Sequence, residues 1–210
     1  MKIAIIGATG KAGSKILNEV LARGLDVTAI VRTASKLTQD ISVIEKDVLS
    51  LTKEDVAAFD VVVNAFGAPF GQEGQHVVAG KHLIDILAGT STRLIVVGGA
   101  GSLFVDEAQT TRLVDTPDFP EVFVPTAKNQ FQNLLDLQAS NITWTFISPS
   151  AFFDPEGGRT GHYTIGQDQL LINNTGESYI SYADYAIALV DEIEKSVHIN
   201  KRFTVVAEKA

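Results

Sequence analysis

The sequence contains no cysteine. This absence excludes disulfide bonds, thiolate catalysis and cysteine-ligated metal sites. No apolar run reaches the roughly 18 residues that a membrane-spanning helix needs. The N-terminus also lacks a basic region followed by a signal-like apolar stretch. We therefore expect a cytoplasmic protein that has no membrane partner and no metal cofactor.

Positive charge is also scarce. The chain has 17 Lys and Arg residues against 25 Asp and Glu residues, which gives a formal net charge of −8. Binding to nucleic acid requires basic patches that neutralise phosphates, so we expect no nucleic-acid partner. With 210 residues, of which 45% are hydrophobic, the chain is predicted to form a single domain with a sizeable core.

Three glycines follow the first apolar run of the chain. The run at 3–6 is typical of a buried strand, and Gly7, Gly10 and Gly13 come next, with a helical pattern after Gly10. Glycines in a strand–turn–helix let a pyrophosphate approach the backbone at a helix N-terminus. The spacing is a variant of G-x-G-x-x-G, with a first gap that is one residue longer. The sequence therefore predicts a dinucleotide site here, and the alternative is a tight turn without a ligand.

Positive charge follows the second expected strand, at 26–31. In dinucleotide-binding folds an acidic residue at this strand end binds the 2′-hydroxyl of NAD, whereas an arginine accommodates the 2′-phosphate of NADP. No Asp or Glu occurs between Asp26 and Asp40, but Arg32 and Lys36 do. We therefore predict that NADP(H) is preferred over NAD(H). The alternative is that both side chains are solvated loop cations.

Strand and helix patterns alternate along the chain. Strands are expected at 3–6, 26–31, 41–45, 60–64, 93–97, 142–147 and 202–206, with short strands within 160–172 and an extended piece at 178–180. Helices are expected at 11–23, 55–59, 74–87, 127–140 and 184–195. This alternation predicts an α/β fold with a Rossmann-type doubly wound parallel sheet flanked by helices. A small C-terminal substrate-side lobe is expected from the segments 102–120 and 150–180.

Ligands of such sheets lie beyond the carboxyl ends of the strands. Asp47 and Val48 follow the third strand, where Asp47 either accepts a hydrogen bond from the adenine amine or caps the next turn. The small residues around Phe66, from Ala65 to Gly67, suit close passage of the cofactor. Phe152 and Phe153 follow the sixth strand and either wall a substrate pocket for a flat ring or pack in the core.

Several motifs together resemble a known family. They are Gly-Ala-Thr-Gly-Lys-Ala-Gly at 7–13, Val-Arg-Thr-Ala-Ser-Lys-Leu at 31–37, Val-Val-Gly-Gly-Ala-Gly-Ser-Leu at 96–103, Ile-Ser-Pro-Ser at 147–150 and Ser-Tyr-Ile-Ser-Tyr-Ala-Asp-Tyr-Ala at 178–186. The chain is similar to atypical short-chain dehydrogenases/reductases of the NAD(P)H-binding, NmrA-like branch, which includes small flavin reductases and biliverdin-IXβ reductase-like proteins. The resemblance covers essentially the whole chain.

The resemblance implies a Rossmann fold and a preference for NADPH. It also implies that the Asp184 carboxylate lies near a helix start in a structural role. The full set of expected cofactor-binding residues is Gly7, Thr9, Gly10, Lys11, Ala12, Gly13, Arg32, Lys36, Asp47, Val48, Ala65, Phe66, Gly67, Gly98, Lys128 and Pro149.

One departure from the wider family concerns its catalytic Tyr-x-x-x-Lys pair. The tyrosine protonates the substrate oxygen, and the lysine lowers the pKa of that tyrosine and binds the ribose. Lys128 matches the lysine, but Val124 stands where the tyrosine belongs. Because valine cannot transfer a proton, alcohol–ketone chemistry is disfavoured. Lys128 either still binds the ribose or is a surface lysine.

The leading functional hypothesis is an NADPH-dependent oxidoreductase that passes a hydride to a flat conjugated acceptor such as a flavin or quinone, which requires no tyrosine acid. Ser102 is expected to donate a hydrogen bond to the acceptor. His162, Tyr163 and His76 are candidate proton donors. The alternatives are a non-catalytic NADP(H)-binding redox sensor and, less favoured, a nucleotide-sugar epimerase or dehydratase relative. The sequence leaves a monomer and a homodimer open.

Overall fold

A mixed eight-stranded sheet forms the centre of the protein. The computed structural model describes residues 1–210, and the strands follow the order β3-β2-β1-β4-β5-β6-β10-β8. The strands are β1 (Lys2–Ile6), β2 (Asp26–Val31), β3 (Ser42–Glu45), β4 (Val61–Asn64), β5 (Arg93–Val97), β6 (Trp144–Ser148), β8 (Thr164–Gly166) and β10 (Lys201–Val206). All pairings are parallel except that of β8 with β10. The predicted Rossmann-type sheet is confirmed.

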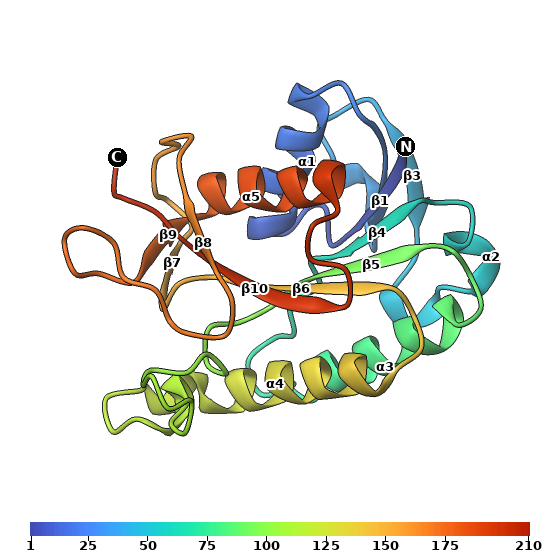
Figure 1. The fold of residues 1–210 in the computed structure, drawn as a ribbon. Coiled ribbons are helices and arrows are strands. Elements are labelled where there is room, and N and C mark those ends of the chain that lie inside the picture. Colours follow the sequence, from blue (N-terminus) through green and yellow to red (C-terminus); the bar gives the residue numbers. More distant parts are fainter.

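Helices cover both faces of this sheet. α1 (Lys11–Ala22) and α5 (Tyr182–Lys195) lie on one face, while α3 (Gln75–Leu87) and α4 (Val124–Ala139) lie on the other (Figure 1). The short helix α2 is formed by Lys53–Val56. No helix of the structure combines the length and the apolar character needed to cross a membrane. The cytoplasmic location stays a prediction.

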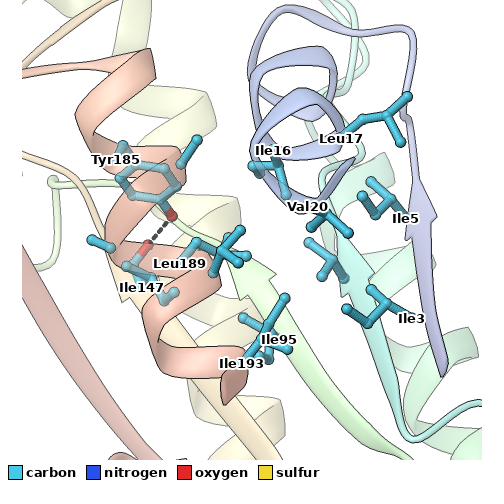
Figure 2. Packing of buried hydrophobic residues seen from close by; sticks show 14 of the residues in the cluster. Ile3, Ile5, Ile16, Leu17, Val20, Ile95, Ile147, Tyr185, Leu189 and Ile193 are labelled. Carbon is cyan, nitrogen blue, oxygen red and sulfur yellow. Dashed lines mark hydrogen bonds between the residues drawn. The ribbon is translucent and has the colours of Figure 1, made fainter. Parts of the chain in front are cut away.

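The hydrophobic core is divided into two clusters by the sheet. Successive residues of β1 alternate between them, so Ile3 and Ile5 join the cluster under α1 and α5, whereas Ala4 and Ile6 join the cluster under α3 and α4. Figure 2 shows the first cluster, where the buried Tyr185 of α5 donates a hydrogen bond of 2.8 Å to the carbonyl of Ile147. Burial on both faces explains the nearly unbroken apolar runs of these strands.

Several boundaries differ from the sequence-based expectation by one to three residues, and three of them have the following form. The helix expected at 55–59 lies at 53–56, because Thr52 and Asp55 form a capping box that starts it earlier. α4 begins at Val124 rather than at 127, since Pro125 is tolerated in the first turn of a helix. The strand expected from 142 begins only at Trp144.

A small C-terminal lobe extends from the carboxyl edge of the sheet. It holds β8 and a two-stranded parallel sheet of β7 (Phe152–Asp154) and β9 (Tyr179–Ser181). The two expected substrate-side segments meet here, because the backbone N–H of Phe104 donates to the carbonyl of Asp168 and the N–H of Leu170 donates to the carbonyl of Phe104. Segment 103–120 forms no regular strand or α-helix and contains one short 3-10 helix, at Leu113–Asp115, as its irregular sequence predicts.

Candidate functional site

The glycine turn joins β1 to α1, and each of its glycines is present for a different structural reason. Gly7 has a φ of +76°, and a Cβ there would lie 2.7 Å from the carbonyl oxygen of Ala65. A Cβ on Gly13 would lie 2.1 Å from the carbonyl oxygen of Gly7, so this glycine permits helix and strand to pack closely. Gly10 is the N-cap of α1 and provides no side-chain cap. The first N–H groups of α1 are therefore left for an anion.

A cleft of about 550 Å³ opens beside this turn, at the carboxyl ends of β1, β2, β3 and β4. Its position between β1 and β4 is the point where the strand order reverses, as in other doubly wound sheets with a bound dinucleotide. The predicted residues that line it are Gly7, Thr9, Gly10, Arg32, Lys36, Asp47, Val48, Ala65, Phe66 and Gly67. At the glycine turn the cleft is bounded by backbone atoms, and there is no room for a Cβ. The lining residues therefore fit a dinucleotide.

Five further residues line the cleft but were missed from the sequence. They are Ile6, Ile30, Val31, Thr33 and Lys46. Lys46 follows β3 in the same way that Arg32 follows β2, so the strand-end rule that selected Arg32 also points to Lys46. Thr33 directly follows Arg32, but it carries no charge that would mark it as a phosphate ligand.

The end of the cleft beside β2 and β3 carries three cations. Arg32 and Lys36 are exposed and pair with no carboxylate, whereas the ammonium of Lys46 lies 2.6 Å from Asp55. Asp47 is the acid nearest to them in the lining, and its carboxylate accepts a hydrogen bond of 3.0 Å from the N–H of Leu49. The capping alternative for Asp47 is thus confirmed.

Phe66 forms a wall of the cleft, and His76 lies behind it. The two rings meet edge to face, with centroids 5.9 Å apart. Burial lowers the pKa of His76, although Glu73 opposes the shift. The structure thus places His76 against the ring of Phe66, where burial favours the neutral imidazole.

Ser102 does not occupy the position expected of an acceptor ligand. Its side chain is buried, and its hydroxyl accepts a hydrogen bond of 2.9 Å from the guanidinium of Arg202. The same guanidinium donates to the Ser102 carbonyl and to Asp168. An acceptor cannot reach this hydroxyl without displacing Arg202, so burial argues against the expected contact.

Tyr163 is likewise committed to a structural contact. Its hydroxyl donates a hydrogen bond of 2.8 Å to Asp191 of α5, whose carboxylate also accepts from Arg23. Arg23 follows the 12 residues of α1, which extend about 18 Å from the glycine turn. Burial and the Asp191 carboxylate both raise the pKa of Tyr163, which weakens it as an acid. The expected role as proton donor is not supported.

His162 and Asp184 lie near one another in the fold. His162 is exposed in the loop before β8. The Asp184 carboxylate is buried in the first turn of α5 and accepts hydrogen bonds from the N–H groups of Thr160 and Gly161. The expected structural role of Asp184 is confirmed, and it fixes the base of the loop that carries His162.

Phe152 and Phe153 cannot wall one pocket together. They are consecutive residues of β7, so their side chains point to opposite faces. Phe153 packs against Tyr182 and Tyr185, with centroids 3.9 and 4.7 Å away. Phe152 is exposed and lines a separate pocket of about 400 Å³ with Ala151, Glu177, Ser178, Tyr179 and Lys209. The core alternative holds for Phe153.

The remaining expected cofactor residues lie outside the lining of the cleft. They are Lys11, Ala12, Gly13, Gly98, Lys128 and Pro149. Gly98 is required by packing, since a Cβ there would lie 2.1 Å from the ring of Phe146. Lys128 is exposed on α4, one turn after Val124. Contacts of these residues with a cofactor stay predictions.

Comparison with known proteins agrees with this geometry. Residues 7–195 match the family described as NAD(P)H-binding. The uncharacterized Bacillus subtilis (strain 168) protein YwnB is 63% identical over 211 residues, which cover 99% of both chains.

Solved structures show the same likeness. A Streptococcus pneumoniae TIGR4 protein, described as a "putative NADH-flavin reductase", is 47% identical with a TM-score of 0.94 and covers 99% of this chain and 100% of its own. A Bacteroides thetaiotaomicron protein, described as a "putative epimerase", is 36% identical with a TM-score of 0.86 over 100% and 98% of the two chains. At 20% identity and a TM-score of 0.73, the anaerobilin reductase ChuY from Escherichia coli O157:H7 shares the fold over 98% of this chain and 97% of its own.

The glycine turn, the cleft at the switch point and these likenesses lead to one assignment: the chain belongs to the NAD(P)H-binding family.

Proposed function

We propose that the protein is an NADPH-dependent reductase of a flat conjugated acceptor such as a flavin or a quinone. The observation that carries the cofactor preference is the cluster of Arg32, Lys36 and Lys46 at the adenosine end of the cleft. Arg32 and Lys36, which pair with no carboxylate, suit a 2′-phosphate, and an arginine can bind it with two parallel hydrogen bonds. The description of the pneumococcal relative names NADH, so the preference needs its own measurement.

Each part of the cleft has a role in this proposal. The backbone of Gly7 and Gly10 and the start of α1 would hold the pyrophosphate. Val48 would border the adenine, and the segment from Ala65 to Gly67 would contact the cofactor near the end of β4. Bound NADPH supplies a hydride, and together with one proton from water this converts an oxidised flavin or quinone into its two-electron reduced form.

No side chain near the cleft is arranged as a strong acid. Val124 replaces the tyrosine of the wider family, Tyr163 is bound to Asp191, and Ser102 is bound to Arg202. A flavin or quinone delocalises the incoming charge over its rings, so it needs no dedicated acid and depends on orientation instead. The missing acid therefore favours conjugated acceptors over ketones.

The test is NADPH oxidation followed by its absorbance with FMN, riboflavin, menadione and a simple ketone as separate acceptors. We expect oxidation that depends on the flavins or the quinone and none with the ketone. If no acceptor promotes oxidation, the reductase proposal is wrong.

A redox sensor without turnover is the second candidate. It is favoured because Val124 stands where the wider family has its catalytic tyrosine. Calorimetric titration with NADP⁺ and NADPH separates the two functions. A sensor distinguishes the two redox forms in affinity and shows no turnover with any acceptor, whereas a reductase turns over.

A further inference from the structure

Two aromatic rings are exposed next to the candidate site. Phe70 follows β4 and is 70% exposed, and Phe123 precedes α4 and is 48% exposed. The rings come from segments more than fifty residues apart, yet their centroids lie 6.2 Å from one another at an interplanar angle of 38°. Val122 beside them is 59% exposed. Leaving apolar rings in water forgoes burial energy, and such patches often mark binding sites.

Both rings are held by hydrogen-bonded turns. The N–H of Gln72 donates to the carbonyl of Pro69 across Phe70, and the N–H of Phe123 donates to the carbonyl of Pro120. The outward position of each ring is therefore set by the backbone around it. A ring presented in this way loses little conformational freedom when it binds a ligand.

The two rings come from the connections that follow β4 and β5. Phe70 lies four residues beyond Phe66, which lines the cleft. On the other side, α4 lies against the loop that follows β5, since a Cβ on Gly101 would lie 2.5 Å from the Cβ of Ala127. Phe70 and Phe123 are therefore carried by the connections that leave the carboxyl ends of β4 and β5. The cations mark the adenosine end beside β2 and β3, so the opposite end of a bound dinucleotide lies near this pair.

We propose that Phe70 and Phe123 form the stacking platform that binds the flat conjugated acceptor. This inference rests on the proposed reductase function and names the residues that select its substrate class. Ring faces favour a planar π-system over an aliphatic molecule of similar size, and no charged side chain is required. The platform replaces the joint wall expected from Phe152 and Phe153, which their opposite directions exclude.

The experiment measures binding and turnover separately. Calorimetry gives the dissociation constants of FMN and menadione for the NADP⁺ complex of the wild type, Phe70→Ala, Phe123→Ala and Phe70→Leu. Loss of stacking is expected to weaken the binding of at least one probe about tenfold in each variant, including the leucine variant, which retains apolar area but no ring. NADPH affinity is expected to stay unchanged. Val197→Ala is the control, because it removes a 63% exposed apolar side chain between α5 and β10, at the opposite edge of the sheet.

The outcomes distinguish the platform from the reaction. If neither probe binds the wild-type complex, or if the variants bind as tightly as the wild type, the platform is wrong. If the alanine variants instead dissociate a dimer in light scattering and bind the probes normally, the patch is a self-association surface and the inference is also overturned. If the probes bind through these rings but NADPH is not oxidised, the platform stands and the reductase proposal fails.

Discussion

Arg202 and Ser102 are joined by two hydrogen bonds although 100 residues separate them. The guanidinium donates to the Ser102 carbonyl at 3.1 Å and to its hydroxyl at 2.9 Å. A third bond, to the Asp168 carboxylate at 2.7 Å, extends the link to the C-terminal lobe. Strand β10 thereby holds the loop after β5 and the lobe in one arrangement.

Ser102→Ala is expected to affect stability more than catalysis. Loss of one hydrogen bond to a charged group should lower the free energy of unfolding by about 1–2 kcal/mol. Because Ser102 is only 3% exposed and its hydroxyl is bonded to Arg202, kcat/KM should change by less than about twofold. Urea unfolding and acceptor-dependent NADPH oxidation check the two quantities. A large loss of kcat/KM at unchanged stability would restore Ser102 as an acceptor ligand.

Gly13→Ala is expected to destabilise the protein by about 3 kcal/mol or to prevent folding, because the added Cβ meets backbone that cannot move away. The matched control is Gly74→Ala, where a Cβ meets nothing within 4 Å and φ is an ordinary −56°. Thermal unfolding followed by circular dichroism compares them. Equal melting temperatures for both variants would show that α1 and β1 pack less closely than described.

Arg32→Ala is expected to weaken NADPH binding about 10- to 100-fold, the loss of a charge-assisted hydrogen bond. NADH binding should change little, since NADH has no 2′-phosphate. Lys201→Ala, which removes an exposed cation at the start of β10, controls for the change in net charge. Calorimetry gives the dissociation constants of both cofactors. An equal loss of affinity for NADPH and NADH would show that Arg32 does not bind the 2′-phosphate.

Asp191 should make stability depend on pH at acid values. Burial opposes its ionisation, but hydrogen bonds from Lys195, Tyr163 and Arg23 prevail and lower the pKa of Asp191 to about 2. Since the ordinary pKa is about 4, the native carboxylate contributes about 2 kcal/mol above that pH. This contribution is lost as the pH falls from about 4 toward 2.

The measurement compares the wild type with Asp191→Asn in urea unfolding across this pH range. The difference in unfolding free energy should shrink as the pH falls. A difference that stays constant would mean that the Asp191 carboxylate is not preferentially ionised in the folded state.

Most of the cleft lining could be predicted from the sequence because its signals are local. The spacing of Gly7, Gly10 and Gly13 and the position of Arg32 directly after β2 each lie within one strand–loop unit. The rule that ligands bind beyond the carboxyl strand ends then places these units together. Lys46 obeys the same rule, but the prediction at this strand end rested on its neighbour Asp47 instead.

The acceptor half depends on partners that are distant in the chain. The hydroxyl of Tyr163 is bonded to Asp191, and the hydroxyl of Ser102 is bonded to Arg202. Such side-chain directions follow from tertiary contacts that no short motif encodes. The alternation of Phe152 and Phe153 is the exception, because the period of a strand already implies opposite faces.

The proposed reaction is the transfer of a hydride from NADPH to a flat conjugated acceptor. The most direct test follows anaerobic oxidation of NADPH by FMN or menadione, with deuterium placed in turn at each of the two hydrogens on nicotinamide C4. We predict acceptor-dependent oxidation that is slowed by deuterium at one of the two positions only, since the protein presents one face of the ring. Absence of acceptor-dependent oxidation, with NADPH still bound, would contradict the claim.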